Sequence, residues 1–178
     1  MQHDSSSLAA RAEIADVIAT YCHAIDRRRW ELMEQLFHDD ATYSFGTIEG
    51  TWREFVAIAK ALIDPLPATH HQLGQTAFEI DGDRATTETY MTATHRIPAD
   101  APVDGPFPGR GHDYQLVMAG RYVDRFERRG GQWRIAHRVG VTDWTSEHAF
   151  PDGTEFPEPL RPDPGAAMSF TVPGRVSP

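Results

Sequence analysis

The chain has 178 residues, a single cysteine and a formal net charge of −9 at pH 7. This length suits one domain, and one cysteine excludes an intramolecular disulfide. The arginines are scattered along the chain, whereas phosphate binding needs a concentrated basic face. Nucleic acid is therefore excluded as a partner, and a neutral or weakly charged small molecule is expected. Residues 1–7 are polar and no apolar run reaches the roughly 18 residues of a membrane span, which predicts a cytoplasmic protein without membrane contact.

The first third of the chain predicts helices, because its apolar residues recur at helical spacing. The predicted helices are residues 7–29, a short stretch from Trp30, and residues 52–63. Ser7 is available as the N-cap of the first helix, and Pro65 follows the end of the third. Residues 38–40 are expected to break the second helix before a strand over residues 41–46.

Beyond Ala68 the apolar residues alternate, which predicts strands. The expected strands are residues 69–80, 85–97, 114–128 and 132–145. Two glycine-containing segments, residues 81–83 and 129–131, provide hairpin turns between neighbouring strands. Helices followed by an antiparallel meander indicate an α+β fold, in which a curved sheet covers the helices.

Two proline-rich segments fit no regular element. Residues 98–112 predict a long loop, and loops of this length are often functional. Residues 150–178 contain too many prolines for a helix or a central strand, yet they keep several large apolar side chains. We therefore divide the chain into a domain of residues 1–147 and an extension of residues 148–178. The extension is expected to pack on the domain or a neighbouring subunit, with a free tail as the alternative. Either segment is a candidate to close the mouth of a pocket.

Four motifs follow one another in a specific order. They are Tyr21-Cys22-His23-Ala24-Ile25-Asp26, Leu36-Phe37-His38-Asp39-Asp40-Ala41-Thr42-Tyr43, Thr69-His70-His71-Gln72-Leu73-Gly74 and Gly120-Arg121-Tyr122-Val123-Asp124-Arg125-Phe126. Their order resembles the SnoaL-like family of the nuclear transport factor 2-like superfamily, over about residues 8–146. The resemblance implies a cone-shaped barrel, with three N-terminal helices packed on a curved, mostly antiparallel sheet. It also implies a homodimer or homotrimer formed through the outer face of the sheet.

The resemblance assigns a candidate general base. Scytalone dehydratase, bile-acid dehydratase and hexachlorocyclohexane dehydrochlorinase share an aspartate and a histidine that match Asp26 and His71, and the match selects His71 over His70. A neutral imidazole accepts a proton near pH 7, and a buried carboxylate on its other nitrogen would orient it. The alternative is that Asp26 only caps local structure. Gly74 suggests a β-bulge just beyond the histidines.

Three further candidates come from the same motifs. Tyr21 and Tyr43 match tyrosines of the bile-acid dehydratase, and they would either donate hydrogen bonds to a substrate oxygen or belong to the core. Arg138 matches an arginine of the dehydrochlorinase, and it would either bind an anion in the pocket or be a surface charge. Strict alternation along the strand expected over residues 132–145 predicts that His137 shares a face with Ile135, opposite to Arg138.

The remaining candidates follow from strand periodicity and composition. His95 lies four residues after Met91, so both should face the same way, and His95 is either a second polar group in the pocket or an inert strand-end histidine. The expected substrate contacts are Met91, Met118, Tyr122 and Trp52. Tyr122 stands near the place where scytalone dehydratase has a second catalytic histidine. The nine histidines do not show metal-ligand spacing and no nucleotide-binding motif is present, so neither a metal nor a cofactor is expected.

These residues together predict a cofactor-independent lyase. The expected reaction is a dehydratase-type elimination or an aldehyde-releasing retro-aldol cleavage on a hydroxylated aromatic, polyketide-like or steroid-like molecule. An isomerase or cyclase that uses the same pocket is the first alternative. The second is a non-catalytic binding or structural subunit.

Overall fold

The computed structural model describes residues 5–151 and Thr154. The helices are α1 (Ser5–Asp26), α2 (Met33–Leu36) and α3 (Trp52–Ile63), with a 3₁₀ turn, η1, at Trp30–Leu32. The strands are β1 (Phe37–Phe45), β2 (Ile48–Thr51), β3 (Ala68–Asp81), β4 (Arg84–Ile97), β5 (Tyr114–Arg129) and β6 (Gln132–Ala149). The predicted α+β order, helices before a run of long strands, is confirmed.

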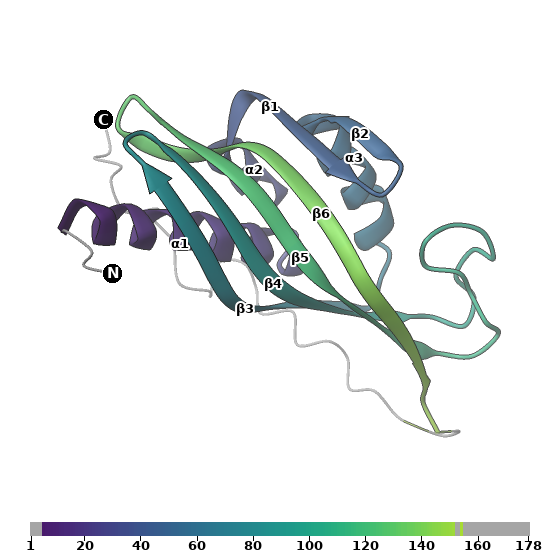
Figure 1. Cartoon of the computed structure of the whole chain (residues 1–178). Coiled ribbons are helices and arrows are strands. Elements are labelled where there is room, and N and C mark those ends of the chain that lie inside the picture. The colour runs from purple at the N-terminus through teal and green to yellow at the C-terminus, as the bar shows by residue number, and fades with distance from the viewer. Residues whose placement is uncertain (1–4, 152–153, 155–178) are drawn as a thin grey trace.

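The strands form one sheet in the order β2-β1-β6-β5-β4-β3. β1 pairs with β6 in parallel, and the other neighbouring strands pair antiparallel. The long strands β3 to β6 twist and curve together, and the helices pack on one side of them (Figure 1). The predicted cone of helices on a curved, mostly antiparallel sheet is therefore confirmed.

Helix α1 packs an apolar stripe against the sheet. Ile14, Ile18, Tyr21 and Ile25 are spaced by three or four residues, and all four are buried. Burial of such a stripe supplies most of the stability of a helix of this kind. The helix begins at Ser5, so the prediction that Ser7 is its N-cap is wrong.

The end of α1 is tied to the end of α3. Arg28 has a left-handed backbone, with φ of +54°, which stops α1 after Asp26. The Arg28 guanidinium donates hydrogen bonds to the backbone oxygens of Asp26 at 3.2 Å, Ile63 at 3.2 Å and Leu66 at 2.8 Å. At its other end α3 begins with a capping box between Thr51 and Glu54. The helix predicted over residues 52–63 is confirmed.

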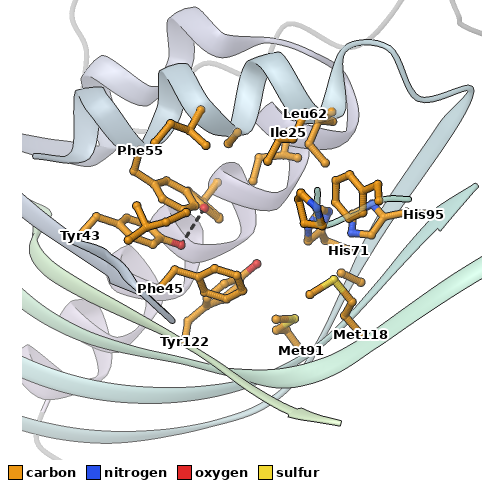
Figure 2. A pocket seen from close by; sticks show the side chains of 18 residues that line it. Ile25, Tyr43, Phe45, Phe55, Leu62, His71, Met91, His95, Met118 and Tyr122 are labelled. Atoms are coloured by element: carbon orange, nitrogen blue, oxygen red, sulfur yellow. Dashed lines mark hydrogen bonds between the residues drawn. The ribbon is translucent and has the colours of Figure 1, made fainter. Parts of the chain in front are cut away.

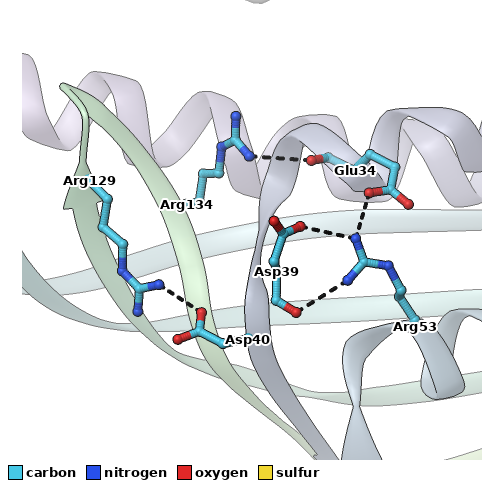
Figure 3. A network of polar contacts seen from close by, with 6 residues as sticks. All are labelled: Glu34, Asp39, Asp40, Arg53, Arg129 and Arg134. Atoms are coloured by element: carbon cyan, nitrogen blue, oxygen red, sulfur yellow. Dashed lines mark hydrogen bonds and ion pairs between the residues drawn. The ribbon is translucent and has the colours of Figure 1, made fainter.

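Strand β1 begins earlier than the sequence predicts. It starts at Phe37, so the break expected between the second helix and the first strand is wrong. The two aspartates placed in that break instead project from the strand into ion pairs. Arg53 contacts Asp39 at 3.0 Å and Arg129 contacts Asp40 at 2.7 Å (Figure 3). These pairs are exposed and contribute little to stability. Burial of Phe37, which is 0% exposed, favours the strand at this position.

A β-bulge in β6 changes which side chains face the helices. The pairing of β6 with β5 skips Ala136, so strict alternation fails there. Ile135 and Arg138 are consequently both fully buried on the inner face. His137 points to the other face, where its Nδ1 lies 2.7 Å from the Thr42 hydroxyl. The prediction that His137 shares a face with Ile135 is therefore wrong.

Strand β6 ends at Ala149, two residues beyond the predicted domain boundary. The expectation that the proline-rich extension packs on the domain concerns residues 152–153 and 155–178, which lie outside the described residues. In the part of the chain that the structure describes, no helix has both the length and the apolar character required to cross a membrane.

Candidate active site

A cavity of about 150 Å³ lies between the inner face of the sheet and the helices. Most of the side chains that line it are apolar or aromatic, and among the described lining residues none is Asp, Glu, Lys or Arg. Its polar groups are the hydroxyls and imidazoles of Tyr21, Tyr43, Tyr122, His71 and His95. An uncharged ligand suits such a cavity, because a charged one would lose its hydration without gaining an ionic partner.

The polar groups gather at two ends of the cavity. Figure 2 shows Tyr43 and Tyr122 at one end, beside Phe55, and His71 and His95 at the other. Apolar side chains form the wall between them. A ligand in the cavity therefore meets hydroxyl donors at one end and imidazole nitrogens at the other.

The Asp26–His71 pair is present, as the motifs predict. Asp26 Oδ1 lies 2.7 Å from His71 Nδ1, and Asp26 Oδ2 accepts a hydrogen bond of 2.8 Å from the backbone N–H of His71. The side chains are 16% and 8% exposed, respectively. A carboxylate only accepts hydrogen bonds, so Nδ1 carries a proton, and in the neutral imidazole the lone pair is on Nε2. His71 lines the cavity with a ring whose orientation and tautomer are set by Asp26.

Strand β3 places His71 rather than His70 inside. The two residues point to opposite faces of the strand, and His70 is exposed. His71 pairs with Ala93 of β4, which lines the same cavity. The predicted bulge near Gly74 is confirmed, because the register of β3 against β4 shifts just after Leu73.

His95 is the second imidazole of the cavity. It is 3% exposed, and its Nδ1 lies 2.9 Å from the Thr69 hydroxyl. The ring meets the His71 ring edge to face, with centroids 5.6 Å apart. Burial, followed by the smaller effect of His71, lowers the pKa of His95 to about 3. His95 is consequently neutral near pH 7, and its Nε2 is the nitrogen that a ligand can reach.

Three tyrosines form the other end of the cavity. The Tyr21 and Tyr43 hydroxyls are 3.2 Å apart, and the Tyr43 ring stacks on Phe55 with centroids 3.5 Å apart. The ring of Tyr122 meets that of Tyr21 edge to face, at 5.5 Å. Burial raises the pKa of all three phenols, so they stay protonated and can donate hydrogen bonds near neutral pH.

Arg138 lies behind the tyrosines and does not line the cavity. Its guanidinium carbon is 4.1 Å from the ring centroid of Tyr21 and 4.3 Å from that of Tyr122. Asp124, its partner on β5, accepts two hydrogen bonds of 2.6 Å from it. Neither the pocket nor the surface position expected from the sequence is correct. The bulge in β6 turns Arg138 inward, and the tyrosine rings separate it from any ligand.

Only some of the expected substrate contacts line the cavity. Met91, Met118 and Tyr122 line the cavity, whereas Trp52 does not. The Trp52 ring stacks on Phe37 with centroids 5.2 Å apart and is 2% exposed, so it belongs to the core. As the first residue of α3, it lies on the side of that helix that packs against the sheet.

Sequence reasoning missed several parts of the wall, among them Phe45 of β1 and Ile48 of β2. A further part is the apolar face of α3, including Phe55, Ala59 and Leu62. Helical periodicity predicts that this face points inward, but it cannot distinguish a cavity wall from a packed core. Another is formed by Pro106 and Phe107. The sequence names residues 98–112 as a candidate to close the pocket mouth, but no periodicity singles out these two residues.

The histidines do not assemble a metal site within residues 5–151 and Thr154. No group of three or more His, Cys, Asp or Glu side chains is placed there to hold a metal ion.

The model of the SnoaL-like domain family matches residues 6–139. An uncharacterized protein of Mycobacterium tuberculosis is 26% identical over 138 residues, which cover 75% of this chain and 86% of that protein. A hexachlorocyclohexane dehydrochlorinase from Novosphingobium barchaimii is 18% identical, covers 85% of this chain and 97% of its own, and gives a TM-score of 0.66. A nuclear transport factor 2-like superfamily protein from Salmonella enterica is 17% identical. The match covers 76% of this chain and 92% of that protein, with a TM-score of 0.63.

At these identities the structural likeness shows the fold, and the family match spans most of the chain. The chain therefore belongs to the SnoaL-like domain family and has the nuclear transport factor 2-like fold.

Proposed function

We propose that the protein is a cofactor-independent lyase that eliminates water from an uncharged hydroxylated ketone of aromatic, polyketide-like or steroid-like type. The observation that carries the proposal is the Asp26–His71 pair at the wall of an apolar cavity. A base with a fixed tautomer and a shielded ligand site are the parts that removal of a proton from carbon requires.

The first step is transfer of a proton from carbon. His71 Nε2 takes the proton from the carbon next to the ketone, and the electron pair of that C–H bond moves onto the carbonyl oxygen. Asp26 stabilises the imidazolium that forms. A hydroxyl of the Tyr21–Tyr43 pair donates a hydrogen bond to the developing oxyanion. A positioned general base contributes about 10²–10⁴-fold to the rate, so the oxyanion donors supply much of the remainder.

The second step expels the hydroxyl on the next carbon. The enolate re-forms its carbonyl, the new carbon–carbon double bond forms, and the carbon–oxygen bond to the hydroxyl breaks. The proton held by His71 leaves with that hydroxyl as water, which returns the imidazole to its starting state. His95 remains neutral at this pH because its pKa is lowered to about 3. It therefore orients the hydroxyl by a hydrogen bond while His71 carries the proton.

The family and a solved neighbour support the reaction class. The chain belongs to the SnoaL-like domain family, and a dehydrochlorinase shares its fold. Dehydrochlorination, like dehydration, is an elimination. A retro-aldol cleavage that releases an aldehyde would use the same base and donors, and the test below separates the two by their products.

The test is product analysis on a panel of β-hydroxy aryl ketones, beginning with β-hydroxytetralone. We expect the wild-type protein to produce a species lighter by one water, and His71→Gln to lose this activity. His70→Gln is the matched control, because His70 lies next in the chain but on the exposed face. A product of unchanged mass would show isomerisation, and a released aldehyde would show cleavage. No conversion of any ketone in the panel would favour a binding module.

A further inference from the structure

The segment between β4 and β5, residues 98–113, sends one aromatic side chain back into the cavity. Its tip is open to solvent, and Val103 is 78% exposed. Pro106 and Phe107 nevertheless line the cavity, and Phe107 packs against the hydrophobic core. Gly105, with φ of +111°, has a backbone conformation that favours glycine, and it directly precedes these two residues.

Phe107 covers His95. Their ring centroids are 4.8 Å apart, with the planes inclined by 46°. On its other sides His95 contacts Thr69 through Nδ1 and the ring of His71. Phe107 therefore covers the side of His95 that faces residues 98–113. Its ring forms the wall of the cavity at the end where the two histidines lie.

Hydrogen bonds within the segment and at its base hold it in shape. Gly109 N donates to Pro102 O at 2.9 Å, and Gly111 N donates to Ala99 O at 3.3 Å. A Cβ atom at Gly109 would lie 2.1 Å from the Ala101 oxygen, so this close approach requires glycine.

The base of the segment is held in the same way. The Asp113 carboxylate accepts hydrogen bonds from the Arg96 side chain at 2.6 Å and from Ala99 N at 3.0 Å. The Tyr114 hydroxyl donates to Pro108 O at 2.6 Å. All of these bonds join the segment to itself or to the strand ends beside it. Movement of Phe107 away from His95 would leave the pairing of the sheet intact.

We propose that Phe107 is the gate and a specificity-determining residue of the cavity, admitting flat uncharged ligands and limiting how far they extend past His95. This inference rests on the proposed function only in taking this cavity as the ligand site. An aromatic ligand would meet the Phe107 ring edge to face or offset, which is the arrangement that such ring pairs prefer. A ligand with a further fused ring would require the Phe107 ring to move out of its place.

The gate is tested first without any ligand. Diethyl pyrocarbonate modifies accessible neutral imidazoles, and mass spectrometry of peptides gives the rate at each histidine. We expect Phe107→Ala to raise the modification rate at His95 by about tenfold or more. Without the Phe107 ring, the reagent reaches His95 without a local opening of the segment. The exposed His70 is the internal standard, and Val103→Ala at the exposed tip is the control variant. An unchanged rate at His95 in a folded Phe107→Ala protein would overturn the proposal.

Ligand selection is tested second. Affinities for tetralone and for a linearly fused three-ring ketone are measured with the wild type, Phe107→Ala and Phe107→Leu. We expect the ratio of affinities to shift towards the three-ring ketone by about tenfold in Phe107→Ala, and by less in Phe107→Leu, which keeps part of the apolar cover. The conservative variant also keeps the test decisive if the alanine variant does not fold.

The two proposals can fail separately. Faster modification of His95 in Phe107→Ala, in a protein that dehydrates none of the ketones, would contradict the lyase and support the gate. Loss of dehydration in His71→Gln, together with unaltered His95 protection and ligand ratio in Phe107→Ala, would support the lyase and contradict the gate.

Discussion

Both carboxylate oxygens of Asp26 form hydrogen bonds with one residue, His71. One oxygen binds the His71 ring and the other binds the His71 backbone N–H. The carboxylate therefore fixes the ring relative to its own strand as well as setting the tautomer. A carboxylate with only a local capping role would have no reason to reach a strand 45 positions away in the sequence. This double contact orients the His71 ring in the way that the proposed role as a base requires.

His95 makes stability depend on pH in a direction that follows from its lowered pKa. Its pKa is about 3 in the folded protein, against an ordinary value of 6.5. As the pH falls below 6.5, the unfolded chain binds a proton that the folded protein does not bind. The free energy of unfolding therefore falls with decreasing pH, and the loss continues until about pH 3. Between pH 7 and pH 5 this one group removes about 2 kcal/mol.

The measurement is urea unfolding of the wild type and of His95→Gln at pH 7 and pH 5. Other titrating groups contribute to both proteins, so the difference between them isolates His95. We expect the wild type to lose about 2 kcal/mol more than the variant over this interval. Equal losses would show that His95 takes up a proton as readily in the folded protein as in the unfolded chain.

The sequence predicted the residues of the pair better than their surroundings. Motif order placed Asp26 and His71 together, and the structure brings them within hydrogen-bond distance. Arg138 was misplaced because its position depends on the bulge at Ala136, which no glycine marks in the sequence as Gly74 marks the bulge in β3. Phe107 was missed because its contact with His95 is made by an irregular segment.

At the scale of elements, Arg28 joins α1 to α3. Its left-handed backbone and its bonds to three carbonyl oxygens hold the helix that carries Asp26 against the helix that lines the cavity. Arg28→Ala removes these bonds and keeps a backbone conformation that is unfavourable for alanine. We expect it to lower the free energy of unfolding by about 2–3 kcal/mol.

Arg28→Gly separates the two effects. Glycine also loses the hydrogen bonds, but it tolerates the left-handed conformation, so it should be about 1 kcal/mol more stable than the alanine variant. Urea unfolding measures both, with Arg27→Ala at the exposed neighbouring position as control. A glycine variant no more stable than the alanine variant would contradict the role given to the backbone conformation.

Strands β5 and β6 share a buried ion pair between Asp124 and Arg138. Both side chains are 0% exposed, and two tyrosine rings cover the guanidinium. Arg138→Met would leave the carboxylate buried without its partner, at a cost of about 3–5 kcal/mol. The double variant Asp124→Leu with Arg138→Met removes both charges and should recover most of that loss. Thermal or urea unfolding of the three proteins decides this, and a double variant no more stable than the single one would contradict it.

Element boundaries were predicted where the chain carries a clear signal. Pro65 and the apolar period of α3 predicted residues 52–63, and the glycine turns predicted the long strands. Strand β2 and the early start of β1 were missed. Both are too short to show a clear period. Strand β2 forms by pairing with the preceding β1 across the turn at residues 46–47, whereas β1 also depends on β6, which is distant in the sequence.

For the whole molecule, the curved sheet and the helices enclose an uncharged cavity that differs sharply from the charged surface. The chain carries a net charge of −9, and none of the described residues lining the cavity is cationic. A ligand carboxylate would therefore lose its hydration without finding a partner. We expect a carboxylated tetralone to bind at least about tenfold more weakly than tetralone, a difference of about 1.4 kcal/mol.

Salt distinguishes the cause of that difference. Long-range repulsion by the surface would be screened by added salt, whereas the cost of burying a carboxylate would persist. Isothermal titration at low and high ionic strength provides the comparison. Recovery of the carboxylated ligand's affinity at high salt would show that surface charge, rather than the cavity, excludes anions.

Hydrogen–deuterium exchange at the acidic carbon of tetralone in deuterated water tests the central claim most directly, because it reports proton removal without requiring a leaving group. We expect the wild-type protein to accelerate exchange above buffer, and Asp26→Asn to reduce that acceleration by about 10²–10⁴-fold while tetralone still binds. The His70→Gln control should match the wild type. Exchange that is equally fast with wild type and Asp26→Asn, or no faster with wild type than with His71→Gln, would contradict the assignment of His71 as the base.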